Sequence, residues 1–226
     1  MSAANPKKYF QRSYNSFFLI AMIEELINSS HFVEEDQKEL CKKYFRQIPF
    51  ELDAQWFYSY QLSPFPYQGD IIDKFDFYFT ETEGGEIVIR QLEDQTCLLL
   101  SNTCDMDPKE GARKKFVSVV PVFDYSEFAE AERPDPYSRA QWEEYLKAVK
   151  DNRITEILFI PGKKEINDSV VFLDRIFSCE VHQLLIMMEK ERTRRLLTLT
   201  QIGHYYFLIK LTHHFARIEN KEEIKR

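Results

Sequence analysis

The chain has 226 residues, a formal net charge of −7, 44% hydrophobic residues and 15% aromatic residues. This composition predicts a globular protein with a substantial core and excludes a disordered chain. The acidic balance opposes generic binding to a phosphate backbone, although it leaves room for a local basic stripe. Four cysteines without zinc-type spacing, and no recognisable signal peptide, indicate a reduced, cytoplasmic protein with no metal and no other cofactor.

Residues 1–54 have the pattern of two helices. Aromatic and aliphatic side chains recur at helical spacing over residues 9–28. A second helix follows, with acidic residues 34–36 in its first turn and basic residues in its last, and it ends at Pro49. The apolar run FFLIAMI at residues 17–23 is far too short to span a bilayer, so no membrane contact is expected. An aromatic, proline-containing connector at residues 55–68 is predicted to strap these helices to the domain that follows.

From residue 69 the pattern changes to strands, and residues 69–226 are predicted to form the main domain. Phe75, Phe77 and Phe79 alternate with polar residues, and a Gly84–Gly85 turn leads into a partner strand, EIVIRQL. TCLLLS and FVSVVPV read as two further strands. Residues 124–152 form an insertion that contains the helix RAQWEEYLKAV.

Strands resume with TEILFIP and SVVFLDRIFSCEV, and a long helix closes the chain. Thr198 or Thr200 is placed to cap this last helix. Sequential strands joined by short turns favour an antiparallel, partly closed barrel. A parallel nucleotide-binding sheet would need a helix between most strands. The predicted class is therefore α+β: N-terminal helices, a small antiparallel barrel with a helical insertion, and a long C-terminal helix.

The order of several short motifs resembles the MazF/PemK (Kid-type) toxin family. The motifs are QGDII, CLLLSNTCD, VSVVPV, DSVVFLDRI and RTRRLL, followed by a closing helix, and they cover roughly residues 69–216. The resemblance implies an SH3-like barrel, a homodimer, cleavage of single-stranded RNA without a metal, and a toxin–antitoxin or phage-defence setting. The chain departs from the family at both catalytic positions. The family's Arg-Pro reads Gln95-Thr96 here, and its Thr-Ser after V-V-P falls within Val122-Phe123-Asp124.

The SNTCD stretch is the first candidate site, and its residues are Ser101, Asn102, Thr103, Cys104 and Asp105. A nucleophilic cysteine needs a neighbouring base, and no histidine can be placed beside Cys104 by spacing. Small polar residues also occur where strands turn, because their side chains bond local backbone groups. The nucleophile is therefore the least favoured of three interpretations. The other two are a polar loop that binds a ligand or partner, and a turn that only ends the strand.

Basic residues form two further candidate binding sites. Arg113, Lys114 and Lys115 follow SNTCD, and Arg192 and Arg195 lie in a run before the closing helix. Either run suits RNA phosphates or the acidic surface of a partner protein.

The sequence thus supports two functional classes. The first is a binding module for a protein or nucleic acid. The second is an endoribonuclease whose catalytic arginine has shifted, with Arg90, Arg175 and Arg194 as candidates. The unmatched family positions and the net acidity favour the binding module.

Overall fold

The computed structural model describes residues 54–59, 65–103, 106, 115–131 and 137–216, and a few single residues between 24 and 43. The predicted helices of residues 1–54 lie almost wholly outside these ranges. The same holds for part of the predicted connector at residues 55–68.

The described strands form one antiparallel sheet, which confirms the α+β class. Its order is β1-β8-β2-β3-β4-β6-β5, with β7 paired to β4 beside that path. The strands are β1 (Tyr58–Ser59), β2 (Ile71–Glu83), β3 (Glu86–Leu99), β4 (Phe116–Asp124), β5 (Ile157–Ile160), β6 (Ser169–Phe172), β7 (Phe177–Glu180) and β8 (Arg195–Leu199). No pairing between described strands joins β1 to β5, so the sheet is open and the closed SH3-like barrel is not confirmed.

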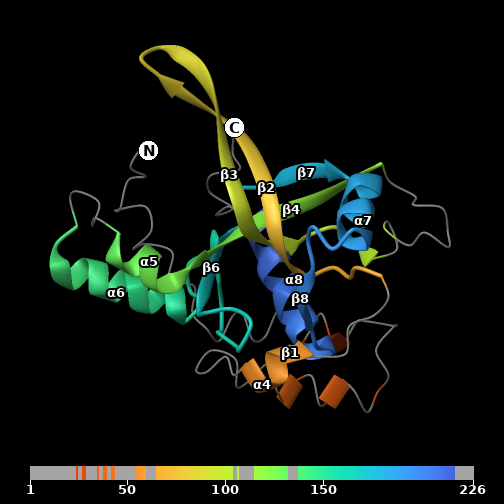
Figure 1. Cartoon of the computed structure of the whole chain (residues 1–226). Coiled ribbons are helices and arrows are strands. Elements are labelled where there is room, and N and C mark those ends of the chain that lie inside the picture. The colour runs from red at the N-terminus through yellow and green to blue at the C-terminus, as the bar shows by residue number, and fades with distance from the viewer. Residues whose placement is uncertain are drawn as a thin grey trace, which may run out of the picture.

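Helices cover the sheet in three places (Figure 1). They are α4 (Ala54–Phe57), α5 (Tyr125–Glu130), α6 (Arg139–Lys150), α7 (Val181–Glu189) and α8 (Gln201–Ala216). The predicted insertion helix corresponds to α6, and the predicted closing helix to α8. Thr200 begins α8, because its Oγ1 accepts a hydrogen bond from the Gly203 N–H at 3.0 Å.

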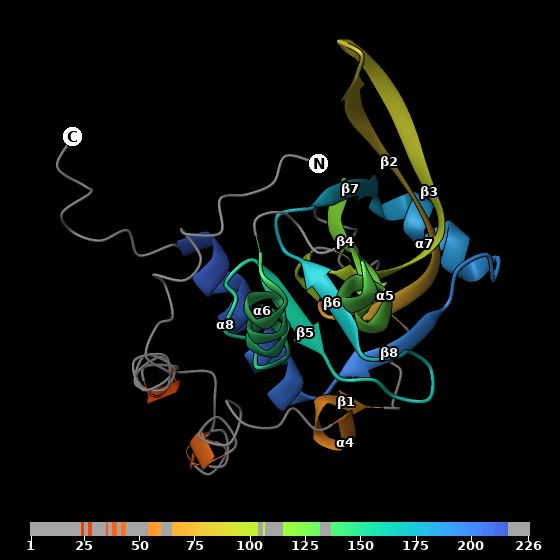
Figure 2. The same ribbon diagram turned by 90° about the vertical axis from the view of Figure 1, so that its left-hand side faces the viewer.

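Each helical layer encloses its own apolar cluster. Phe207 and Ile209 of α8 pack with Ile71, Leu98 and Val120 of the sheet. In the second cluster, Val181 and Leu184 of α7 pack with Phe77 of β2 and Val119 of β4. The third cluster joins α5 and α6 to β5 and β6 through Phe128, Tyr145 and Phe159, and Figure 2 shows these helices beside those strands.

Three predicted strands differ from the structure. EIVIRQL and TCLLLS are one continuous strand, β3, because both pair with β2 along its length. SVVFLDRIFSCEV is two strands, β6 and β7, separated by a turn in which the Arg175 N–H donates to the Phe172 carbonyl at 3.0 Å. Its last residue, Val181, begins α7, a helix that the strand pattern did not predict.

The hairpin of β2 and β3 extends well beyond the rest of the sheet (Figure 1). Apart from the start of β2 and the end of β3, neither strand has another described partner. β2 pairs with β8 only at Ile71 and Ile72, and β3 pairs with β4 only over residues 96–99. We call residues 74–95 the arm. A two-residue turn closes it, and Gly84 and Gly85 both have positive φ angles, 60° and 89°, as a type I′ turn requires.

Candidate binding site

The predicted QGD motif forms the turn that starts β2. The Asp70 carboxylate accepts a hydrogen bond from the Tyr67 N–H at 2.7 Å, and the Asp70 N–H donates to the Tyr67 carbonyl. Gly69 has a φ of 89°, and a Cβ there would lie 2.4 Å from a methyl carbon of Leu199. The backbone conformation therefore favours glycine at this position, and a Cβ would also require the Leu199 side chain to move.

Arg195 points from β8 into the protein, toward this turn. Its Nη1 lies 2.9 Å from Asp70 Oδ2 and also donates to the Phe65 carbonyl. The two side chains are 8% and 0% exposed. Burial raises the pKa of the Asp70 carboxyl, although hydrogen bonds from Thr198, Tyr67 and Arg195 act in the opposite direction. The ion pair of Arg195 and Asp70 therefore links β8 to the turn before β2. A ligand-binding role for Arg195 stays a prediction.

SNTCD is connected to the same turn through Gln68. The Gln68 N–H donates to Thr103 Oγ1 at 3.1 Å, and its side-chain amide donates to the Leu100 carbonyl at 2.6 Å. Ser101 Oγ accepts from the Ser118 N–H at 2.8 Å. Two side chains of the motif thus bond backbone groups of neighbouring segments, while Asn102 is exposed. These contacts support the architectural interpretation of residues 101–103.

His204 of α8 contacts Gln68, the residue that links the turn to SNTCD. Its Nε2 lies 3.2 Å from the Gln68 side-chain oxygen. Burial lowers the pKa of His204, so its neutral form is favoured. The predicted residues Cys104, Asp105, Arg113 and Lys114 lie outside the described residues, so the groove expected between Asp105 and the basic run stays a prediction.

Arg194 differs from its neighbour Arg195 in being exposed. Its backbone N–H and its Nε donate to the Asp73 carboxylate at 2.8 and 2.7 Å, yet its side chain is 74% exposed. Thr193 donates its hydroxyl to the Asp73 carbonyl, and Arg192 is exposed. Arg192 and Arg194 therefore present positive charge at the base of the arm, beside β2.

The other predicted cations lie in separate places. The Arg175 guanidinium is 4.3 Å from the centroid of the Phe172 ring and 5.8 Å from that of Phe123. Lys115 lies 3.2 Å from the Glu180 carboxylate, and its Nζ is 5.3 Å from the centroid of the Phe116 ring. Arg90 is on the arm. Arg194 and Arg195 are therefore neighbours only in sequence. Within the described part of the chain, neither contacts Arg90, Arg175 or Lys115, so these predicted cations do not form one site.

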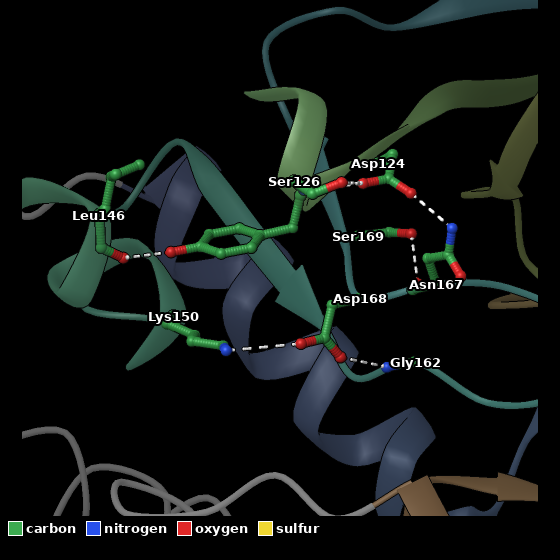
Figure 3. A network of polar contacts seen from close by, with 9 residues as sticks. Asp124, Ser126, Leu146, Lys150, Gly162, Asn167, Asp168 and Ser169 are labelled. Atoms are coloured by element: carbon green, nitrogen blue, oxygen red, sulfur yellow. Dashed lines mark hydrogen bonds and ion pairs between the residues drawn. The ribbon is translucent and has the colours of Figure 1, made fainter. Parts of the chain in front are cut away.

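A polar cavity of about 260 Å³ lies where β4 meets α5. Asp124 caps α5 by accepting from the Ser126 N–H at 2.7 Å, and its other oxygen accepts from the Asn167 side chain at 2.7 Å (Figure 3). Hydrogen bonds from Ser126 and Asn167 lower the pKa of Asp124. Nearby, Asp168 accepts from the Gly162 N–H at 2.7 Å and lies 3.5 Å from Lys150 Nζ (Figure 3). These contacts join the loop before β6 to α5 and α6, so the network holds the insertion in place.

The arm is a surface feature that the sequence did not predict. Over residues 78–91, one face of the arm carries no charged side chain, because register partners share a face of a two-stranded ribbon. This uncharged face consists of Tyr78, Thr80, Thr82, Ile87, Ile89 and Gln91. Tyr78, Ile87 and Ile89 are 60%, 77% and 74% exposed. Large apolar side chains that gather on one exposed face indicate an interaction site.

The opposite face of the arm is charged. It carries Glu81, Glu83, Glu86 and Arg90. Phe77 lies on the same face at the base of the arm, where it is buried. Arg90 lies 2.6 Å from Glu83 and 3.4 Å from Glu81. The whole arm, residues 74–95, contains six acidic residues and two basic ones, a net charge of −4.

Two structural features are absent from the described part of the chain. No group of three His, Cys, Asp or Glu side chains within it is placed to hold a metal ion. None of its helices is long and apolar enough to cross a membrane.

Comparisons with known proteins identify no family. No family model matches the chain, and no curated protein matches it. Among solved structures, the chain is similar to the MazE–MazF complex of Deinococcus radiodurans, with 13% sequence identity over 68% of this chain and 98% of that chain. The TM-score of 0.32 is too low to show a shared fold. The MazF/PemK resemblance therefore stays a prediction from the order of sequence motifs.

Proposed function

We propose that this chain is a binding module that docks a partner protein on the uncharged face of the arm. The observation that carries this proposal is the exposure of Tyr78, Ile87 and Ile89 on one face of a hairpin that projects from the sheet. A two-stranded hairpin is marginally stable in water on its own, and covering its apolar side chains stabilises it. The net acidity of the arm favours a partner whose contact surface combines apolar and basic groups.

The family resemblance adds a setting to this proposal. The order of the motifs from QGDII to RTRRLL supports a MazF/PemK-like, SH3-like architecture and a cytoplasmic toxin–antitoxin or phage-defence system. In such a system a toxin-like chain works with a cognate partner protein, and homodimerisation is part of the same proposal. The predicted binding residues of SNTCD and of the basic runs stay candidates for a second contact.

The double variant Ile87→Asp/Ile89→Asp tests the docking face. Proteins that the wild-type chain retains from an extract of its source cells are identified and purified, and their affinity is then measured by calorimetry. We expect the double variant to bind such a partner at least about tenfold more weakly, because it places charge on a desolvated apolar contact. Ile176→Asp is the matched control, since Ile176 is 38% exposed and lies outside the arm. Equal affinity of the double variant and the wild type would contradict the proposal.

A metal-independent endoribonuclease is the second candidate. It is supported by Arg194, an exposed cation held by the Asp73 carboxylate at the edge of β8. We expect a ribonuclease to cleave single-stranded RNA in the presence of a chelator, and Arg194→Ala to abolish the cleavage. Arg90→Ala and Arg175→Ala test the other two candidates. Arg139→Ala is the control, because Arg139 is 88% exposed on α6. An inactive wild-type chain would remove this candidate.

A further inference from the structure

The outer edge of β3 is open along most of the arm. Among the described strands, β4 covers β3 only over residues 96–99, and residues 86–95 pair with β2 alone. An edge of this kind presents unpaired backbone N–H and C=O groups, which serve as a template for an added strand. The open edge is roughly 30 Å long at the rise of an antiparallel strand.

The turn decides which backbone groups face that edge. In a two-residue hairpin the residues that flank the turn, here Glu83 and Glu86, form a hydrogen-bonded pair. Hydrogen-bonded and non-bonded pairs then alternate along the ladder. Ile87 and Ile89 therefore direct their backbone groups away from β2, toward the open edge. Their exposed side chains lie on the uncharged face beside the same groups.

The two strands of the arm carry equal net charge and differ only near the base. Residues 74–83 of β2 contain Lys74 with Asp76, Glu81 and Glu83, and residues 86–95 of β3 contain Arg90 with Glu86, Glu93 and Asp94. Lys74 lies at the base of the β2 edge, and the exposed Arg194 adjoins it through its bond to Asp73. Arg90 is paired with Glu81 and Glu83. A basic segment is thus attracted by the acidic residues of both strands, and Lys74 and Arg194 disfavour it only at the base of the β2 edge. The exposed Ile87 and Ile89 favour the β3 edge.

We infer that the β3 edge of the arm binds an extended basic segment of a partner protein as a third strand. In that segment apolar residues alternate with Lys or Arg, so that one side covers Ile87 and Ile89 and the other faces Glu81, Glu83 and Glu86. This inference rests on the proposed docking function and adds the conformation and charge of the partner. A second copy of the chain is disfavoured as the occupant, because two acidic arms would place like charges opposite each other.

Synthetic peptides and one proline variant test this inference in the full-length chain. The probe is a peptide in which valine and lysine alternate over about ten residues, the length of strand that this edge accommodates. Gln91→Pro removes one outward N–H from the edge and leaves both isoleucines in place. Gln91→Thr is its matched control. We expect fluorescence anisotropy to show binding to the wild type and to Gln91→Thr. The affinity should fall about tenfold or more for Gln91→Pro, and likewise for a peptide with a central proline.

Equal binding by Gln91→Pro would overturn the inference. So would equal binding of the central-proline peptide, or of a peptide in which valine and glutamate alternate. Arm-dependent dimers in sedimentation would also overturn it, since the edge would then bind a second copy. If Gln91→Pro changes the thermal midpoint, the variant is set aside. The central-proline and valine–glutamate peptides, measured on the wild-type chain, then test the inference. The proposed function fails separately, when Ile87→Asp/Ile89→Asp leaves partner affinity unchanged. A partner that needs the isoleucines but is not displaced by the valine–lysine peptide overturns only the strand addition.

Discussion

Lys210 is a buried amine on α8 that links the helix to the loop before β5. Its Nζ donates to the Asn152 carbonyl at 2.8 Å and also to the Ile154 carbonyl. Burial lowers the pKa of Lys210 to about 7, although Glu156 acts in the opposite direction. The amine therefore contributes a pH dependence to the free energy of unfolding.

The sign of this dependence follows from proton linkage. Between the folded pKa of about 7 and the ordinary value of 10.5, the unfolded chain binds more protons than the folded one. The stability contributed by this group therefore rises with pH across that window, by roughly 1 kcal/mol per pH unit. We expect Lys210→Met to remove the rise.

Urea unfolding at about pH 7 and about pH 9, for the wild type and for Lys210→Met, measures this difference. The comparison cancels the groups common to both proteins, such as Cys97, whose pKa burial raises. A difference between the two proteins that is the same at both pH values would show that Lys210 has an unshifted pKa.

The contrast between Arg194 and Arg195 shows what sequence reasoning leaves open at the scale of single residues. Both lie in the basic run that the sequence singles out. Arg195 is buried against Asp70, which is 125 positions away in the chain, and no spacing rule connects two residues that far apart. The sequence could identify the run as basic, but only the folded sheet decides which arginine faces the solvent.

At the scale of elements, Gly203 sets how closely α8 approaches α4. A Cβ at Gly203 would lie 2.3 Å from the backbone carbonyl oxygen of Phe57, which also accepts from the Thr200 N–H at 3.0 Å. Helix propensity alone predicts that Gly203→Ala stabilises α8 by about 1 kcal/mol. The close contact predicts the opposite sign, because a backbone carbonyl cannot move aside as a side chain does.

We therefore expect Gly203→Ala to lower the free energy of unfolding by about 1–3 kcal/mol. Thr212→Ala is the control, since Thr212 is exposed on the same helix and should gain a few tenths of a kcal/mol. Urea denaturation measures both variants. A stabilising Gly203→Ala would mean that α4 does not pack against α8 as described.

The elements themselves were predictable to different degrees. Alternation through Phe75, Phe77 and Phe79 and the Gly84–Gly85 turn predicted the hairpin correctly. These patterns did not predict that the hairpin extends beyond β8 and β4. The length of one strand in a sequence gives no information about the length of the strand that pairs with it. The break between β6 and β7 was missed because VVFL and IF are equally apolar on both sides of Asp174 and Arg175.

At the scale of the whole molecule, the order of strands was harder to predict than their presence. The sequence predicted an antiparallel arrangement, and the described pairs are antiparallel. Barrel closure depends on whether the first and last strands of the path meet, and these belong to segments far apart in the chain. The described sheet stays open, and its central hairpin projects from it as the arm (Figure 2).

We propose that the arm binds the partner and that the rest of the chain holds the arm in place. Phe77 and Leu92 are register partners at the base, and Phe77 is buried while the side chains beyond it are largely exposed. Replacing residues 78–91 with Asn-Gly should therefore close a short hairpin and leave the three apolar clusters intact. The thermal midpoint should change by no more than a few degrees, because little apolar area is lost.

The most direct measurement is the affinity of this short-arm chain for the purified partner, with its thermal midpoint measured in parallel. We expect a folded protein with a nearly unchanged midpoint and no detectable binding. A short-arm chain that folds and still binds the partner with wild-type affinity would contradict it.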